Sequence, residues 1–284
     1  MTASFPSLLY LLSERLGGDG IDFAEQLALE TKSEVKRHRD FHTAVVTLKG
    51  GDWEGWKIDV ATARLEYYPV PVALPTVELS CLKMDLYRRD FSINAGAIQL
   101  NASKYGHLVD FFQIENDIKS KHIRVLHSLS FVEDPTRLYR AVRFEQRYGF
   151  QIDKQTSRLM QGAIRHGFVH RLSGFRLLHE IQKIMEEKKP HKCFNRLHKP
   201  FELFNPIHPR LQELYSPKPV QQALASMDLY AMLGLQQRYS RWKLLFLALC
   251  SVIKFVTSSY YSFLLPFMPN LLMVETGTEI LEKF

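Results

Sequence analysis

The stretch Ser130–Phe150 reads SFVEDPTRLYRAVRFEQRYGF and marks the point where the chain changes from a region with predicted strands to a mainly helical region. Asp134 followed by Pro135 favours a helix start, because aspartate accepts hydrogen bonds from free backbone N–H groups and proline has no N–H to lose. Asp134 and Arg137 are then expected on one helical face. Taken alone, the pattern is more typical of an ordinary capped helix with surface arginines.

The region before Ser130 has the periodicity of a small α/β unit. Ile21–Leu29 has apolar residues at helical spacing, whereas Thr43–Leu48 and Gly55–Ala63 flank a Gly-Gly-Asp turn and indicate two strands. In the second strand Asp59 alternates with large apolar residues, which places it on the opposite face, toward a cleft or toward water.

The segment Asp85–Ala97, DLYRRDFSINAGA, is the densest in polar side chains that could bind a ligand. Adjacent arginines offer planar forks suited to phosphate oxygens or ribose hydroxyls, and a neighbouring acid fixes their rotamers. The alternative is an amphipathic helix with a solvated charged face, because apolar residues recur at helical spacing over Ser80–Asn94.

The composition indicates a folded protein with a mild preference for polyanions. Lys plus Arg exceeds Asp plus Glu by 37 − 30 = 7, and the pI is about 9.2. Cys81, Cys193 and Cys250 are widely separated, which argues against a disulfide scaffold or a zinc site and for the reducing cytoplasm. The apolar run Leu244–Ile253 is too short for a membrane helix, so we expect a buried helix and no membrane association.

Several segments together resemble one known family. They are, in chain order, Lys57–Arg64 (KIDVATAR), Glu66-Tyr67-Tyr68, Leu74-Pro75, Asp85–Asn94, Gly106–Arg124, Asp134–Phe150 and Arg171–Glu180 (RLSGFRLLHE). Their order and spacing resemble the class II tRNA nucleotidyltransferases and bacterial poly(A) polymerases, from about Gly18 to about Leu211. Within that family, the chain is most similar to nucleotidyltransferase domains at the C-terminal end of larger bacterial multidomain proteins.

The resemblance implies an activity and a set of site residues. Such enzymes add nucleotides to an RNA 3′ end without a nucleic-acid template, using ATP (and CTP in CCA-adding members) and two Mg²⁺ ions. The residues implied to hold the ribose and triphosphate are Arg88, Arg89, Asp90 and Asn94. Those implied to read the base edge, with two supporting arginines, are Asp134, Arg137, Arg140 and Arg176. Asp59 is implied to be the catalytic carboxylate, and the region after Phe150 to carry the RNA.

The sequence departs from the family pattern where the metal ligands belong. The family has an Asp-x-Asp pair shortly before a Gly-Asp-Gly-like turn, which is present here as Gly18-Asp19-Gly20. Counting back without gaps places the two metal positions at Leu11 and Ser13, which offer no carboxylate for a hard cation. Gln113-Ile114 also replaces a Gly pair, and Phe175 stands where an acid is common before an arginine.

We therefore predict an α+β fold, with a small mixed β-sheet nucleotidyltransferase head followed by an all-helical neck and body. The expected domains are an N-terminally incomplete head (1–125), a helical neck and RNA-binding domain (126–215) and a weakly matched, truncated tail (216–284). The predicted function is CCA addition, A addition or polyadenylation of an RNA 3′ end, which these motifs do not separate. The alternatives are a catalytically inactive nucleotide- and RNA-binding module and a fragment without function.

Overall fold

The computed structural model describes residues 19–72, 75–232 and 241–254. The chain divides into two compact units, of which the first runs to Ser120 and includes Arg124–Leu126, and the second holds Lys121–Ile123 and the residues from His127 onward. We call them the head unit and the helical unit. The α+β fold class is confirmed, although the predicted domain limits stay predictions.

The head unit combines short helices with antiparallel strands. Its strands pair in the orders β1-β2-β3, β4-β5 and β6-β7. The elements are α1 (Gly20–Glu30), β1 (Glu34–His38), β2 (Thr43–Thr47), β3 (Lys57–Ala61), β4 (Arg64–Tyr67), β5 (Thr76–Leu79), α2 (Leu82–Tyr87), β6 (Gly96–Ile98), β7 (Leu108–Asp110) and α3 (Ile114–Ser120), with 3-10 turns at Arg39–Phe41, Gly51–Trp53, Ser92–Asn94 and Ala102–Lys104.

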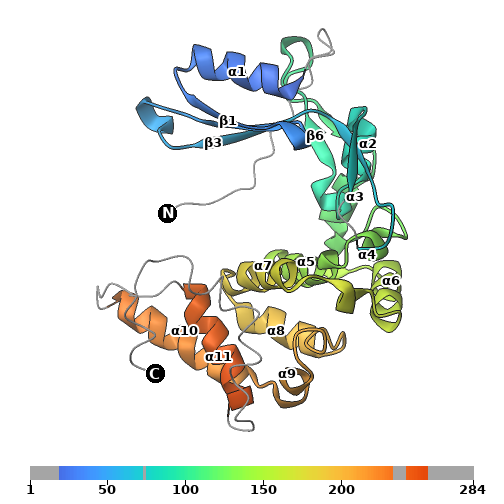
Figure 1. The fold of residues 1–284 in the computed structure, drawn as a ribbon, viewed down its shortest axis with the longest axis vertical. Coiled ribbons are helices and arrows are strands. Elements are labelled where there is room, and N and C mark those ends of the chain that lie inside the picture. Colours follow the sequence, from blue (N-terminus) through green and yellow to red (C-terminus); the bar gives the residue numbers. More distant parts are fainter. Residues whose placement is uncertain (1–18, 73–74, 233–240, 255–284) are drawn as a thin grey trace. The chain divides into compact units, whose positions relative to one another are not determined.

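Helix α1 covers one face of the β1-β2-β3 sheet (Figure 1). Its buried Ala24 and Ala28 pack against Ala44, Val46 and Val60 of the sheet, as the strand alternation predicts.

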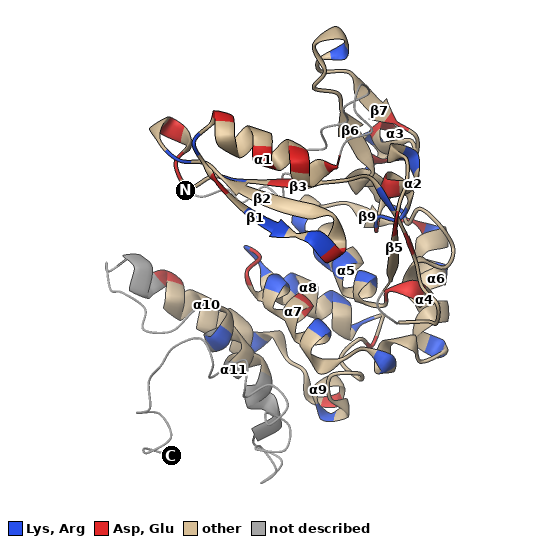
Figure 2. Ribbon diagram, turned by 45° about the horizontal axis from the view of Figure 1, so that its top comes forward, with Lys and Arg blue, Asp and Glu red and all other residues tan. Residues whose placement is uncertain are grey.

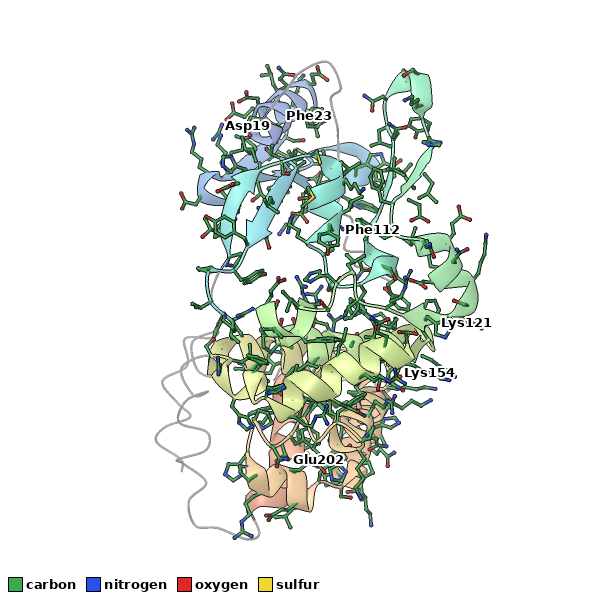
Figure 3. All side chains as sticks on the ribbon, turned by 90° about the vertical axis from the view of Figure 1, so that its right-hand side faces the viewer. Asp19, Phe23, Phe112, Lys121, Lys154 and Glu202 are labelled. Carbon is green, nitrogen blue, oxygen red and sulfur yellow. The ribbon has the colours of Figure 1, made fainter. Side chains whose placement is uncertain are left out.

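The start of α1 explains the Asp-Gly pair in its turn. Asp19 caps the helix by accepting from the Ile21 amide at 2.9 Å, and it lies at the end of α1 in Figure 3. A Cβ on Gly20 would lie 2.8 Å from the backbone nitrogen of Thr62, so only glycine fits here. This residue pair serves helix capping and close packing.

Within its described residues, the helical unit has one strand pairing, the parallel pair of β8 (His122–Ile123) with β9 (Gln151–Ile152). Its helices are α4 (Ser130–Glu133), α5 (Thr136–Tyr148), α6 (Lys154–Arg165), a 3-10 turn at Phe168–Arg171, α7 (Gly174–Met185), α8 (Pro190–His198), α9 (Pro209–Leu214), α10 (Pro217–Met232) and α11 (Arg241–Lys254). Helix α5 packs against α7 and α8, and α10 packs against α11.

The core of the helical unit is built around α5. Tyr139 is fully buried, and its hydroxyl donates to the Leu203 carbonyl at 2.9 Å, which satisfies the one polar atom of the ring. Leu245, Phe246 and Leu249 of α11 are buried too, which confirms the expected buried helix over Leu244–Ile253. Among the described helices, none has both the length and the apolar character needed to cross a membrane.

Candidate nucleotide-binding site

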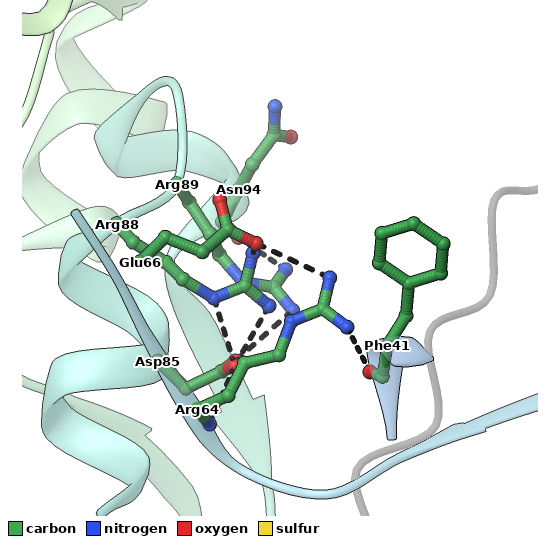
Figure 4. Close-up of polar contacts among 7 residues, drawn as sticks. All are labelled: Phe41, Arg64, Glu66, Asp85, Arg88, Arg89 and Asn94. Atoms are coloured by element: carbon green, nitrogen blue, oxygen red, sulfur yellow. Dashed lines mark hydrogen bonds and ion pairs between the residues drawn. The ribbon is translucent and has the colours of Figure 1, made fainter. Parts of the chain in front are cut away.

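The Arg-Arg-Asp segment forms a turn after α2 in the head unit. The alternative of a solvated helix over Ser80–Asn94 is wrong, because α2 ends at Tyr87 and the Asp85 side chain has no exposed surface. Arg88 donates from Nε and Nη2 to Asp85 Oδ1 at 3.0 and 2.7 Å, and from Nη1 to Glu66 Oε1 at 2.7 Å (Figure 4). Three of its nitrogens therefore contact carboxylates.

Arg64 connects this turn to strand β4 and to the loop before β2. Its backbone amide donates to Asp85 Oδ1 at 3.2 Å, and its Nη2 lies 3.2 Å from Glu66 Oε1. Its Nη1 donates to the carbonyl of Phe41 (Figure 4). Arg89 Nη2 lies 3.9 Å from Asp85 Oδ2. Two carboxylates and three arginines thus form one nearly buried network, in which each charge has an opposite charge nearby.

The remaining residues of the turn hold its backbone. Arg89 donates from Nη1 to the Asn94 carbonyl at 2.8 Å. Asp90 accepts from the Phe91 amide at 2.8 Å and from the Asn94 side-chain amide at 2.9 Å. These hydrogen bonds hold the side chains of Arg89 and Asp90 in defined positions within the turn.

In the helical unit, Asp134 forms the other cluster at the start of α5. Asp134 Oδ1 accepts from the Thr136 amide at 3.0 Å and from the Thr136 hydroxyl at 2.6 Å, which caps the helix as the sequence predicts. The same oxygen accepts from Arg176 Nη2 at 2.8 Å, although the two residues are 42 positions apart. Arg137 is buried and donates from Nη1 to the Ser130 hydroxyl at 2.7 Å.

Burial shifts the pKa of two groups near Arg137. It lowers the pKa of His127 to about 4, and the charge of Arg137 acts in the same direction. It also raises the pKa of Glu133, against the opposing effect of Arg137. His127 Nε2 and Glu133 Oε2 are 3.5 Å apart. Because the imidazole is neutral at pH 7, this contact is not an ion pair.

The other arginines of α5 are not simple surface residues. Arg143 is buried, with guanidinium nitrogens 3.7 Å from Glu180 and 3.6 Å from Glu187. The guanidinium of Arg140 lies 5.8 Å from the centre of the Phe144 ring, within cation–π range. The interpretation of α5 as a capped helix with surface arginines is therefore wrong for Arg143 and incomplete for Arg140.

Asp59 lies on β3 opposite Val45, with its side chain exposed on the sheet face away from α1. This is the face that the strand period predicts. In the described part of the chain, no group of three or more His, Cys, Asp or Glu side chains could hold a metal ion. Leu11 and Ser13, the positions expected for the metal pair, lie outside the described residues. The described residues alone do not fit a two-magnesium centre.

Sequence reasoning missed three residues that build these clusters: Glu66, Ser130 and Glu180. All three stand inside the quoted segments, but nothing in the local pattern showed which arginine each would contact. For Glu180, the buried apolar neighbours Leu177 and Ile181 on α7 were the available signal for its burial.

Comparison with known proteins identifies the fold. The Poly A polymerase head domain matches residues 16–124, and the "Probable RNA and SrmB- binding site of polymerase A" matches residues 149–214. An A-adding tRNA nucleotidyltransferase of Geobacter sulfurreducens is 46% identical over 237 residues, which cover 82% of this chain and 26% of the relative. One from Halalkalibacterium halodurans is 40% identical, covering 63% of this chain and 42% of the relative.

Solved structures agree. The apo form II of a CCA-adding enzyme has a TM-score of 0.69 at 39% identity, covering 86% of this chain and 57% of that chain. A tRNA nucleotidyltransferase complexed with a primer tRNA and an incoming ATP analog has a TM-score of 0.69 at 29% identity, covering 94% and 77%.

The matches define a class of protein in which a poly(A) polymerase-type head precedes a helical RNA-binding region. The chain belongs to the family of class II tRNA nucleotidyltransferases and bacterial poly(A) polymerases. It spans about a quarter of the length of the Geobacter relative.

Proposed function

We propose that this chain selects the nucleotide and binds the RNA in a template-independent RNA 3′-end nucleotidyltransferase that uses ATP. The observation that carries the proposal is the Asp134–Arg176 contact of 2.8 Å at the start of α5, beside Arg137. Three relatives of the chain are A-adding tRNA nucleotidyltransferases, which favours AMP transfer to a tRNA. Such a substrate is consistent with the expected cytoplasmic location.

The chemistry of Asp134 and Arg137 suits particular bases. A carboxylate accepts hydrogen bonds, and a guanidinium donates them. Adenine and cytosine each present an amino donor beside a ring-nitrogen acceptor on the pairing edge, whereas uracil and guanine present a carbonyl acceptor beside an N–H donor. An aspartate next to an arginine therefore complements adenine and cytosine. Arg176 holds Asp134 in place through their ion pair, and the family resemblance assigns a supporting role to Arg140.

The turn after α2 is the proposed site for ribose and triphosphate groups. The family resemblance assigns this role to Arg89, Asp90 and Asn94, whose positions are fixed by hydrogen bonds within the turn. Arg88 contributes through its charge and by fixing the turn on Asp85 and Glu66.

Transfer in this family uses Mg²⁺ ions, which when bound activate the 3′ hydroxyl and stabilise charge on the α-phosphate. Asp59 offers one exposed carboxylate, and the described residues do not complete a metal site. We therefore assign no step of the transfer to a metal held by the described residues. Asp59 is proposed as the group that accepts the proton of the 3′ hydroxyl.

Incorporation of labelled nucleotides tests this proposal. The chain is incubated with a tRNA lacking its 3′ adenosine and with each labelled nucleoside triphosphate, in Mg²⁺ or in EDTA. We expect the chain to bind ATP selectively with nearly no incorporation, because the expected metal positions, Leu11 and Ser13, hold no carboxylate. Mg²⁺-dependent incorporation that Asp59→Ala removes would instead show that the metal ligands are not lost. Absence of both incorporation and ATP binding would refute the proposed function.

A further inference from the structure

The segment from Lys154 to His179 carries most of the net charge of the chain. It contains five lysines and arginines, three histidines and no aspartate or glutamate, whereas the whole chain has an excess of 37 − 30 = 7 basic residues. It covers α6, the 3-10 turn and the first half of α7. Figure 2 shows the Lys and Arg positions of the ribbon in blue, and Lys154 lies at the start of α6 in Figure 3.

Most of these charges are available to a ligand. Arg176 is paired with Asp134. Arg158, Arg165 and Arg171 are exposed and form no ion pair with any described carboxylate. A solvent-facing group of cations without neighbouring acids attracts a polyanion.

Aromatic rings are interleaved with these cations between α6 and α7. The Arg171 guanidinium lies 5.2 Å from the centre of the Phe168 ring, and the His166 ring lies 6.2 Å from it. Phe175, in the first turn of α7, is 67% exposed and has no ring contact with any described residue. We call Arg165, His166, Phe168, His170, Arg171 and Phe175 the junction patch.

We propose that the junction patch binds a single-stranded part of the RNA substrate, with a base stacked on Phe175 and phosphates held by Arg165 and Arg171. The proposal rests on the proposed function and adds the location of its RNA contact. An exposed phenylalanine in the same segment as arginines that form no ion pair with a described carboxylate favours single-stranded RNA, because bases stack on aromatic and guanidinium planes while the backbone contacts the cations. The family match described as an RNA-binding site spans residues 149–214 and includes the patch.

Phe175 is the phenylalanine of the junction patch that is largely exposed. It offers a base a ring without a negative charge, whereas a carboxylate at this position would repel phosphates and could not stack. Phe175 is therefore the residue of the patch whose replacement is most informative.

The test measures binding of a fluorescein-labelled, single-stranded RNA ending in CC by anisotropy, over a series of salt concentrations. Phe175→Ala should weaken binding about tenfold through the lost stack, with the salt dependence unchanged. Phe175→Trp should restore affinity, and Phe175→Glu should weaken it further. Arg165→Ala should instead reduce the slope of log K against log salt by about 0.7, as expected for one lost phosphate contact on a single strand.

The matched control is Lys104→Ala with Tyr105→Ala, which removes one cation and one ring that is 76% exposed, on the loop between β6 and β7. It should bind RNA like the unmodified chain. Circular dichroism checks that the variants are folded, which we expect because these side chains are exposed. Wild-type affinity in both Phe175→Ala and Arg165→Ala would overturn the junction patch alone. Failure of the unmodified chain to bind any RNA would contradict the proposed RNA partner. ATP binding is measured separately, so that the nucleotide-selecting part of the proposed function is tested independently.

Discussion

Arg88–Asp85 in the head unit and Arg176–Asp134 in the helical unit are arginine–aspartate pairs of nearly equal length, 2.7 and 2.8 Å. Their surroundings differ. The Asp85 side chain is 0% exposed and Arg88 is 16% exposed, whereas Asp134 is 20% and Arg176 27% exposed. The length of an ion pair therefore does not decide whether the pair is structural or can bind a ligand. The Asp85 side chain is fully buried, whereas the partly exposed Asp134 can still accept a hydrogen bond from a ligand.

Removal of the fully buried Asp85 carboxylate should have the largest effect on the free energy of unfolding. Asp85→Ala leaves Arg88 and the Arg64 amide without their buried acceptor, so we expect the head unit to lose about 3–5 kcal/mol of unfolding free energy. Urea unfolding measures the loss. The control Glu115→Ala breaks an exposed pair with Lys119 and should cost about 0.5 kcal/mol or less. Similar costs for both variants would show that Asp85 is not part of a buried network.

Acid should destabilise the helical unit through His127. Its pKa is about 4 in the folded protein and 6.5 in the unfolded chain, so between these values the unfolded chain binds the additional proton. Stability is therefore full above about pH 6.5 and falls as pH decreases toward 4. Chemical unfolding at pH 7 and pH 5 measures this difference. His127→Gln should reduce the difference, and an unchanged difference would exclude His127 as its source.

The partly buried Asp134–Arg176 pair should contribute less stability than the Asp85–Arg88 pair. Asp134→Ala removes the cap of α5 and the contact with Arg176, and we expect a loss of about 1–2 kcal/mol. Asp153 caps α6 through the Gln155 and Thr156 amides but has no arginine partner among the described residues, so Asp153→Ala measures a cap alone. The two variants should differ by less than about 1 kcal/mol. A larger difference would mean that the Asp134–Arg176 pair contributes to stability as a buried ion pair does, like the Asp85–Arg88 pair.

The smallest expected effect is a gain in the stability of the head unit when Gln113 is replaced by glycine. Gln113 has a φ of 62°, where a side chain is strained and glycine is not. Gln113→Gly should raise the unfolding free energy by about 0.5–1 kcal/mol. The control Gln161→Gly, inside helix α6, should lower it by about 1 kcal/mol. A loss in both variants would show that the turn before α3 does not strain Gln113.

The same two pairs show what could be predicted from sequence. The cap by Asp134 is local, so the Asp-Pro pair predicted it, and the alternation along β3 predicted the exposed face of Asp59. The network of Asp85 depends on Arg64, 21 positions before Asp85, and on Glu66, 22 positions before Arg88, and β4 has no strong strand signal to place them. Pairing across such distances is set by tertiary packing, which a periodic pattern does not encode. The roles of Arg88, Arg89, Asp90, Asn94, Arg137, Arg140 and Arg176 came from the family resemblance and stay predictions.

The most direct test of the proposed function is a calorimetric titration of the chain with ATP, CTP, GTP and UTP. The chemistry of Asp134 and Arg137 predicts that ATP and CTP bind about tenfold or more tightly than GTP and UTP. Asp134→Asn, whose amide can both donate and accept, should remove most of this preference while the α5 cap is retained. Equal affinities for all four nucleotides, or a preference that survives Asp134→Asn, would contradict the assignment of Asp134 and Arg137 to base selection.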